Sequence, residues 1–232
     1  SPFEHLQGLN HMHSQMLPLA SGQRRFATAS AVLGWFALAV QLYLILWGRW
    51  TDQASLVGGL VRFFSFFTVL TNTLVAVALT CAITERYGAA HRFFRSPIVC
   101  AGITTSILLV GIAYNLLLRH LWTPEGWQWL ADELLHDVMP LLFVGYWWLY
   151  VKKGLLGLKH VLVWIAYPAV YFAWLLFRGN AFGDYLYPFL DIGTLGVGKA
   201  LINAFGVLAG FVTIGLMIVL IDKIKARRVQ NR

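Results

Sequence analysis

The chain has 232 residues, of which 59% are hydrophobic and only 12% are charged, with a mean hydropathy of +0.66. A soluble domain carries roughly 25% charged residues, so this composition excludes an ordinary soluble domain and indicates an integral membrane protein. The net charge of +8 does not indicate nucleic-acid binding, because the basic residues cluster in alternate loops and near the C-terminus, which is typical of membrane orientation.

The residues before the first apolar segment are polar and mixed. Residues 1–20 lack the short apolar core of a signal peptide. They are predicted to be an N-terminal tail or a remnant of expression. Three histidines in this tail, His5, His11 and His13, are expected to belong to such a remnant and not to a metal site.

Six apolar segments of membrane-spanning length then follow one another. Each is about 20 residues long, which fits a hydrocarbon core about 30 Å thick. The predicted spans are about 26–47, 60–84, 97–118, 131–150, 160–177 and 198–221. The sequence therefore predicts an all-α fold, a six-helix transmembrane bundle over residues 21–222, with a basic tail over residues 223–232.

The distribution of lysine and arginine predicts the orientation. Thirteen of these 18 residues lie in the N-terminal tail, the second and fourth loops and the C-terminal tail. The other loops and the adjoining helix ends hold only Arg49, Arg62, Arg119, Arg178 and Lys199. By the positive-inside rule, both termini are predicted to lie in the cytoplasm.

No metal or cofactor site is predicted. Cys81 and Cys100 are too few for a disulfide scaffold or a zinc site, and they are predicted to be reduced cysteines in apolar surroundings. A haem held by two axial histidines would need them on facing helices at similar depth. His136 has no such partner, because His120 is assigned to the third loop and His160 to the inner side.

A polar stripe interrupts the second predicted span. Ser65, Thr68 and Asn72 recur at i, i+3 and i+7, so they are expected to share one face of a helix whose other faces are Phe, Leu and Val. Hydroxyl and amide groups in hydrocarbon cost free energy unless they have partners or border a wet cavity. The stripe is therefore a candidate functional site.

Other polar residues are assigned to the same outer half of the membrane. Thr68 is expected about 13 Å and His136 about 7 Å below the outer surface, at the helical rise per residue. The remaining polar residues on this side are Asn72, Tyr114, Asn115, Asp132, Tyr187, Asp191 and Asn203. Because polar groups at membrane depth are expensive, we expect a cavity between spans two, three, four and six.

Thr68 and His136 suggest a nucleophile and its base. A hydroxyl is a weak nucleophile at neutral pH, and a neutral imidazole within about 3 Å takes its proton during attack. Asp132, one turn before the histidine, or Asp191 is expected to orient the ring. Thr71 is a competing nucleophile. The expected donors to an oxyanion are Asn72, Asn115 and Asn203.

The same residues also have purely structural interpretations, which spacing alone leaves open. A threonine in a membrane helix commonly donates to the carbonyl four residues earlier. A single histidine near a helix end is commonly a packing or interfacial residue, and asparagines commonly bridge helices.

Three motifs resemble those of the androgen-induced-protein family of six-span membrane proteins and its bacterial branch. They are Phe66-Phe67-Thr68-Val69-Leu70-Thr71-Asn72, Leu135-His136-Asp137-Val138-Met139-Pro140 and Tyr187-Pro188-Phe189-Leu190-Asp191. The resemblance implies a transmembrane threonine hydrolase in which Thr68 is the nucleophile and His136 is the base. It also implies a substrate such as a fatty acid ester of a hydroxy fatty acid.

The expected partners are membrane lipids and a lipid-like ester, and the expected location is the bacterial cytoplasmic (inner) membrane. Two other classes of function would use the same outer cavity. A transporter or channel would need polar groups that continue into the inner half. A non-enzymatic lipid-binding protein would tolerate the loss of His136.

Overall fold

The computed structural model describes residues 21–84 and 88–230. The tail predicted for residues 1–20, with its histidines, lies outside the described residues. Every regular element in the described ranges is a helix, and these ranges contain no strand, which confirms the all-α prediction.

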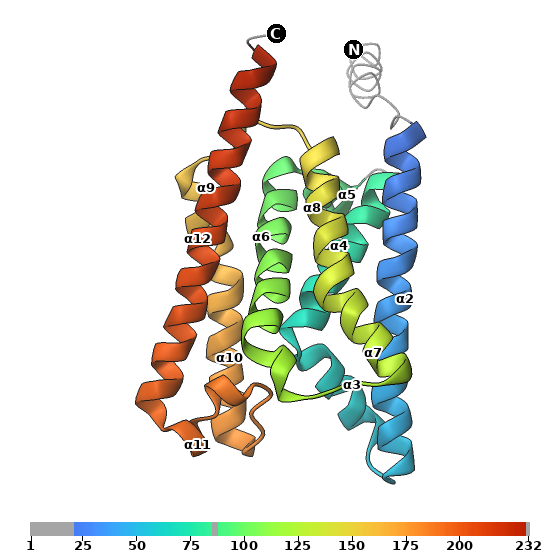
Figure 1. Cartoon of the computed structure of the whole chain (residues 1–232), viewed down its shortest axis with the longest axis vertical. Helices are drawn as coiled ribbons and strands as arrows, with labels where there is room; N and C mark the ends of the chain where they lie inside the picture. Colours follow the sequence, from blue (N-terminus) through green and yellow to red (C-terminus); the bar gives the residue numbers. More distant parts are fainter. Residues whose placement is uncertain (1–20, 85–87, 231–232) are drawn as a thin grey trace, which may run out of the picture.

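The helices run up and down a bundle, and the N-terminal end of α2 and the C-terminal end of α12 lie at the same end of it (Figure 1). The long elements are α2 (Ser21–Thr51), α4 (Phe67–Ile83), α6 (Pro97–Ala113), α8 (Met139–Tyr150), α10 (Ala166–Phe182) and α12 (Val197–Gln230). The short ones are α3 (Leu56–Ser65), α5 (Ala89–Arg95), η1 (Tyr114–Leu118), η2 (Arg119–Leu121), α7 (Gly126–Glu133), η3 (Leu134–Val138), α9 (Leu158–Trp164), η4 (Pro188–Leu190) and α11 (Ile192–Leu195).

Several of these helices are long and apolar enough to cross a membrane, as expected of an integral multi-pass membrane protein. Four continuous stretches qualify within the described residues, Ser21–Thr51, Pro97–Leu121, Leu158–Phe182 and Val197–Arg228. The bent pair of α3 and α4 makes a fifth. The range predicted as the fourth span, 131–150, is helical but is not among them, and it carries three acidic residues. The count of six spans stays a prediction.

The second predicted span is not one helix. At Phe66 the backbone is extended, with φ −82° and ψ 130°, and the axes of α3 and α4 differ by 76°. Ser65 ends α3, whereas Thr68 lies in the first turn of α4. The prediction that these two residues share a helix face is therefore wrong, and Ser65 instead donates to the Val61 carbonyl oxygen at 2.6 Å.

Two π-helical turns, η1 and η3, continue the helices on either side of the third loop. Gly111, one turn before η1, lies against η3. A Cβ atom added to Gly111 would stand 2.9 Å from the carbonyl oxygen of His136, so the close approach requires a glycine. Single π turns inside α-helices frequently occur at functional sites.

The apolar core fills the centre of the bundle. Its largest fully buried side chains include Trp147, Phe143, Phe211 and Leu79. Cys81 and Cys100 are also buried and are free, as predicted. Many large apolar side chains on the outer faces of the helices are exposed, among them Leu162, Phe177, Phe205 and Ile202. This distribution is that of a bundle whose outer surface contacts lipid.

Candidate functional site

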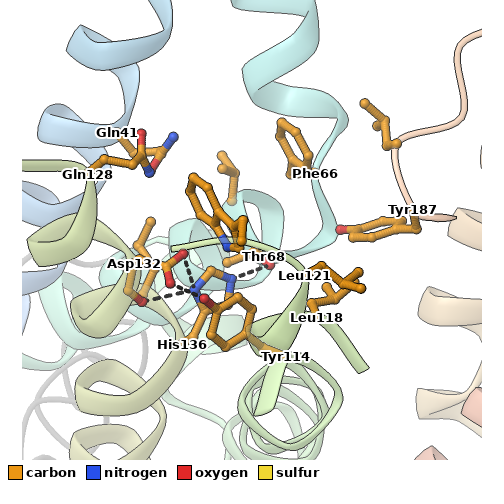
Figure 2. A pocket seen from close by; sticks show the side chains of 14 residues that line it. Gln41, Phe66, Thr68, Tyr114, Leu118, Leu121, Gln128, Asp132, His136 and Tyr187 are labelled. Atoms are coloured by element: carbon orange, nitrogen blue, oxygen red, sulfur yellow. Dashed lines mark hydrogen bonds and ion pairs between the residues drawn. The ribbon is translucent and has the colours of Figure 1, made fainter. Parts of the chain in front are cut away.

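A cavity of about 260 Å³ lies beside the first turn of α4. Its walls are mainly apolar and come from α2, α4, the η1–η2 region, α7–η3 and the loop before η4. Figure 2 shows that the side chains of Thr68, His136, Asp132 and Tyr114 converge at one wall. The predicted cavity between distant segments is therefore present, although α2 lines it and α12 does not.

Thr68 and His136 meet at this wall of the cavity. The Thr68 Oγ1 atom lies 3.3 Å from His136 Nε2. His136 Nδ1 lies 2.9 Å from the backbone carbonyl oxygen of Asp132, which can only accept a hydrogen bond. Nδ1 must therefore carry a proton, and in a neutral ring Nε2 is then unprotonated. That is the tautomer that accepts the proton of the Thr68 hydroxyl.

The break at Phe66 explains why the Thr68 hydroxyl is available. Other threonines within the described helices donate to the carbonyl oxygen four residues earlier, among them Thr73, Thr80, Thr104 and Thr105. For Thr68 the residue four positions earlier belongs to α3, on the other side of the bend. The hydroxyl consequently turns to His136.

Asp132 and Tyr114 hold the other side of the imidazole. An Asp132 carboxylate oxygen lies 3.3 Å from His136 Nδ1, and the carboxylate also accepts a short hydrogen bond from the Tyr114 hydroxyl. The Tyr114 ring stacks on the His136 ring with centroids 3.8 Å apart and planes 17° apart. Asp132 is 4% and Tyr114 is 4% exposed, so the ring is fixed from its edge and its face by buried groups.

Arg119 balances the other two acids on this turn. Its guanidinium pairs with Glu133 at 2.7 Å and with Asp137 through a shorter contact, and it lies over the Tyr114 ring. Asp132 has no ion pair with Arg119 among these contacts. Its carboxylate is therefore the acidic group that faces the imidazole, and it favours an imidazolium when one forms.

Two tyrosine hydroxyls cap the broken end of α4. Phe67 N–H donates to Tyr171 and to Tyr187, each at 3.1 Å, and the Tyr171 hydroxyl donates in turn to the Ser65 carbonyl oxygen at 2.7 Å. The Tyr187 hydroxyl is also within hydrogen-bonding reach of Thr68. Backbone groups freed by a break in a membrane helix must find such partners. The two tyrosines thereby fix the position of Thr68.

Asn72 is buried but does not face the cavity. Its amide nitrogen donates to the carbonyl oxygens of Thr68 and Leu135 at 2.9 and 3.0 Å. These bonds occupy its donors, so the expectation that Asn72 supplies an oxyanion is not met by this geometry. The side chain instead ties the first turn of α4 to the turn that carries His136.

Four other residues proposed from the sequence lie outside the cavity wall. Thr71 is fully buried and bonds to Tyr167 at 3.1 Å. Asn115 donates to Asp137 at 2.8 Å and to its own helix. Asp191 accepts a bond from Thr194 N–H as the N-cap of α11. Asn203 donates to the Phe189 carbonyl oxygen at 2.8 Å.

The contacts of these four residues give physical reasons against the expected roles. The hydroxyl of Thr71 points to α10 rather than to His136. Asp191 is engaged in capping, so Asp132 is the carboxylate beside the ring. The predicted oxyanion donors Asn115 and Asn203 do not line the cavity.

No chemical role was predicted from the sequence for Tyr114, Tyr171 or Tyr187. Tyr114 is next to the proposed Asn115, and Tyr187 opens the third motif. The sequence therefore placed both residues near the site but did not indicate what their side chains do there. Tyr171 lies in an apolar stretch and gave no signal. Gln41 and Gln128, which also line the cavity and bond to each other at 3.0 Å, were likewise missed.

Comparisons with protein-family models, with curated proteins and with solved structures found no match. The likeness to the androgen-induced-protein family therefore rests on the three motifs alone.

Proposed function

We propose that this protein is a membrane-embedded threonine hydrolase that cleaves lipid esters, such as fatty acid esters of hydroxy fatty acids. The single observation that carries the proposal is the arrangement of Thr68 Oγ1, His136 Nε2 and the Asp132 carbonyl oxygen, which places an acceptor nitrogen 3.3 Å from a free hydroxyl. A buried threonine that only bridges helices would not need a histidine in this tautomer, with Tyr114 stacked on its ring and Asp132 bonded to its Nδ1 atom.

The proposed topology places this site in the outer half of the membrane. Six spans with both termini in the cytoplasm would follow from the basic loops, and the shared end of α2 and α12 in Figure 1 supports an even number of crossings. The membrane in question is proposed to be the bacterial cytoplasmic membrane.

The proposed reaction has two halves. In the first, Thr68 Oγ1 attacks the ester carbonyl carbon while its proton passes to His136 Nε2; the tetrahedral intermediate then collapses, and the leaving alcohol takes that proton. In the second, water gives a proton to Nε2 as it attacks the acyl-threonine, and the acid leaves as the proton returns to Oγ1. The Asp132 carboxylate stabilises the imidazolium formed in each half.

The broken end of α4 is the proposed site of oxyanion stabilisation. The first turn of a helix directs its backbone N–H groups and the positive end of its dipole outward. The Tyr187 hydroxyl accepts from Phe67 N–H and lies within hydrogen-bonding reach of Thr68, so it can turn its own proton toward an oxyanion that forms at Thr68. Tyr187 is therefore the proposed donor, and the positive end of the α4 dipole adds to it, because the Phe67 N–H is already bonded to the two tyrosines.

The decisive test is hydrolysis by purified protein in detergent, measured by mass spectrometry of the released hydroxy fatty acid. We expect Thr68→Ala and His136→Ala each to lower kcat by about 10³-fold, in the range found for loss of a nucleophile or its base. Thr68→Ser should retain activity, and the matched control Thr71→Ala should be nearly unaffected, because the Thr71 hydroxyl does not reach the cavity.

A covalent intermediate gives a second readout. A fluorophosphonate probe should modify the peptide that contains Thr68, and the modification should disappear in His136→Ala. Hydrolysis at the wild-type rate in Thr68→Ala would refute the mechanism. Folded wild-type protein that binds lipid esters without cleaving them would favour the lipid-binding function instead.

A further inference from the structure

A second, larger hollow lies on the membrane-facing side of the bundle. It is a groove of about 840 Å³ between the end of α6 with η1 and the stretch of α12 up to Met217, and Phe189 of η4 also lines it. From α12 its lining extends from Ile202 to Met217. At the helical rise this is about 22 Å, which exceeds the depth of one leaflet of hydrocarbon, about 15 Å.

A small third hollow, here called the neck, lies between the groove and the catalytic cavity. The neck is a hollow of about 40 Å³. On one side it shares its walls with the catalytic cavity, through Thr68, Tyr114, Leu118 and Tyr187. On the other side it shares its walls with the groove, through Leu109, Ala113, Phe189 and Val207. The three hollows therefore follow one another from Thr68 to the outer surface of the bundle, and only side chains that line two of them lie between neighbours.

The chemistry of the groove suits a hydrocarbon chain. No charged residue lines it, and its polar side chains are Asn203 and Thr213. Both already have partners, since Asn203 donates to the Phe189 carbonyl oxygen and Thr213 donates to the Ala209 carbonyl oxygen. A ligand in the groove would thus meet apolar surface, which recognises hydrocarbon through burial and offers no partner to a headgroup.

We propose that this groove and neck bind the acyl chain of the substrate, with the ester carbonyl at Thr68 and the chain passing between α6 and α12. The inference rests on the proposed function for the identity of the reacting bond. It adds that the acyl group is long, because only a long chain reaches beyond the neck. It also adds that the chain enters sideways from the lipid phase rather than from water.

Two glycines form part of the groove and allow it to be filled. An added Cβ at Gly206 or Gly210 of α12 would have no neighbouring atom within 4 Å. A side chain at either position would therefore start in open space beside the groove lining, and leucine also favours the helical state over glycine. Gly198, on the same helix, has the same open surroundings but does not line the groove, so Gly198→Leu is the matched control.

The test compares short and long acyl chains. Purified wild-type, Gly206→Leu, Gly210→Leu and Gly198→Leu proteins would be assayed with para-nitrophenyl butyrate and para-nitrophenyl palmitate. Displacing about two methylene groups from the groove predicts about a 15-fold loss of kcat/KM for the palmitate ester in the groove variants. Butyrate hydrolysis, and both activities of Gly198→Leu, should stay at the wild-type level. Equal rates of palmitate hydrolysis in all four proteins would overturn the proposal.

A binding measurement keeps this inference separate from the proposed function. A diazirine analogue of palmitic acid would be cross-linked to each protein in nanodiscs, and the modified peptides identified by mass spectrometry. We expect labelling on the facing sides of α6 and α12 in wild type and Gly198→Leu, and its loss in the groove variants. This outcome would support the groove even if no ester were cleaved, in which case only the hydrolase proposal would fail.

The rival occupant of the groove is a second copy of the chain, since small residues four positions apart commonly pack membrane helices. Native mass spectrometry of the same variants addresses it. A dimer that dissociates in Gly206→Leu and Gly210→Leu, with unchanged selectivity for chain length and unchanged labelling, would show that the groove is a helix-packing surface and would overturn the proposal.

Discussion

Replacement of Asp132 by asparagine tests how the imidazole of His136 is held. In a Ser-His-Asp triad this change costs about 10⁴-fold in kcat because the histidine adopts the wrong tautomer. Here the tautomer is set by the backbone carbonyl oxygen of Asp132, 2.9 Å from Nδ1, and the substitution leaves that oxygen in place. The structure therefore predicts a smaller effect, limited to the loss of the negative charge.

The size of that effect follows from the geometry. The carboxylate lies 3.3 Å from Nδ1, and its attraction to an imidazolium at an effective dielectric constant of 20 is about 5 kcal/mol. The Tyr114 hydrogen bond and the remaining amide dipole reduce this gross value, and we take about half of it as the net loss. Asp132→Asn should therefore lower kcat/KM by about 10- to 100-fold.

The assay is lipid-ester hydrolysis by purified Asp132→Asn, with His136→Ala as the lower reference. Asp137→Asn is the matched control, because that carboxylate lies one turn further on and pairs with Arg119; it should change kcat/KM by less than about 3-fold. A loss as large as that of His136→Ala would show that the carboxylate, not the carbonyl, sets the tautomer. No loss in Asp132→Asn would show that no imidazolium forms beside it.

Three further predictions concern stability, each measured by thermal unfolding in detergent. Asn72→Leu should lower the free energy of unfolding by about 1–3 kcal/mol, because the Leu135 carbonyl oxygen loses a buried donor; an unchanged midpoint would contradict the bracing role. Tyr187→Phe should be mild, because Phe67 N–H keeps Tyr171 as its acceptor, whereas Tyr171→Phe should cost about 1–3 kcal/mol, because the Ser65 carbonyl oxygen loses its donor. The double variant also leaves Phe67 N–H without an acceptor and should cost about 1–3 kcal/mol more than the sum of the two single changes, so simple additivity would argue against the shared cap. Burial, aided by Lys225 and opposed by Asp222, lowers the pKa of Lys153 from 10.5 to about 8. Between these two pH values the unfolded chain binds more protons than the folded protein, so the free energy of unfolding should rise with pH across this window. Lys153→Met should show a smaller rise, and a rise identical to that of wild type would refute the assignment.

The sequence predicted correctly those features that depend on the type of a residue and on its depth in the membrane. The low share of charged residues predicted long apolar helices, and the structure has them, although the second predicted span is bent and the fourth is not among the helices long and apolar enough to cross a membrane. Thr68 and His136 were paired from their depth and their motifs, and the structure brings them to 3.3 Å. Asp132 was placed beside the ring because residues four apart in a helix share a face, and the π turn at this point preserves that contact.

The sequence failed where the backbone departs from a regular helix. No proline or glycine lies within six residues of the bend at Phe66, so helical periodicity assigned Ser65 to the wrong face. The partners that stabilise the bend, Tyr171 and Tyr187, are distant in sequence, and hydrogen bonds to backbone groups leave no pattern in side-chain types. The same reason explains Asn72, whose two carbonyl acceptors were invisible from its spacing.

The capped break also bears on when the protein becomes active as it is made. The acceptors of the Phe67 amide lie 104 and 120 residues further along the chain. Because synthesis proceeds from the N-terminus, α4 enters the membrane well before α10 and the Tyr187 loop exist. Under the proposed function, a nascent or truncated chain would carry Thr68 and His136 but would not hold them in register. Ester cleavage would then begin only after the last third of the chain has been inserted, which would spare the surrounding lipid from an unfinished enzyme.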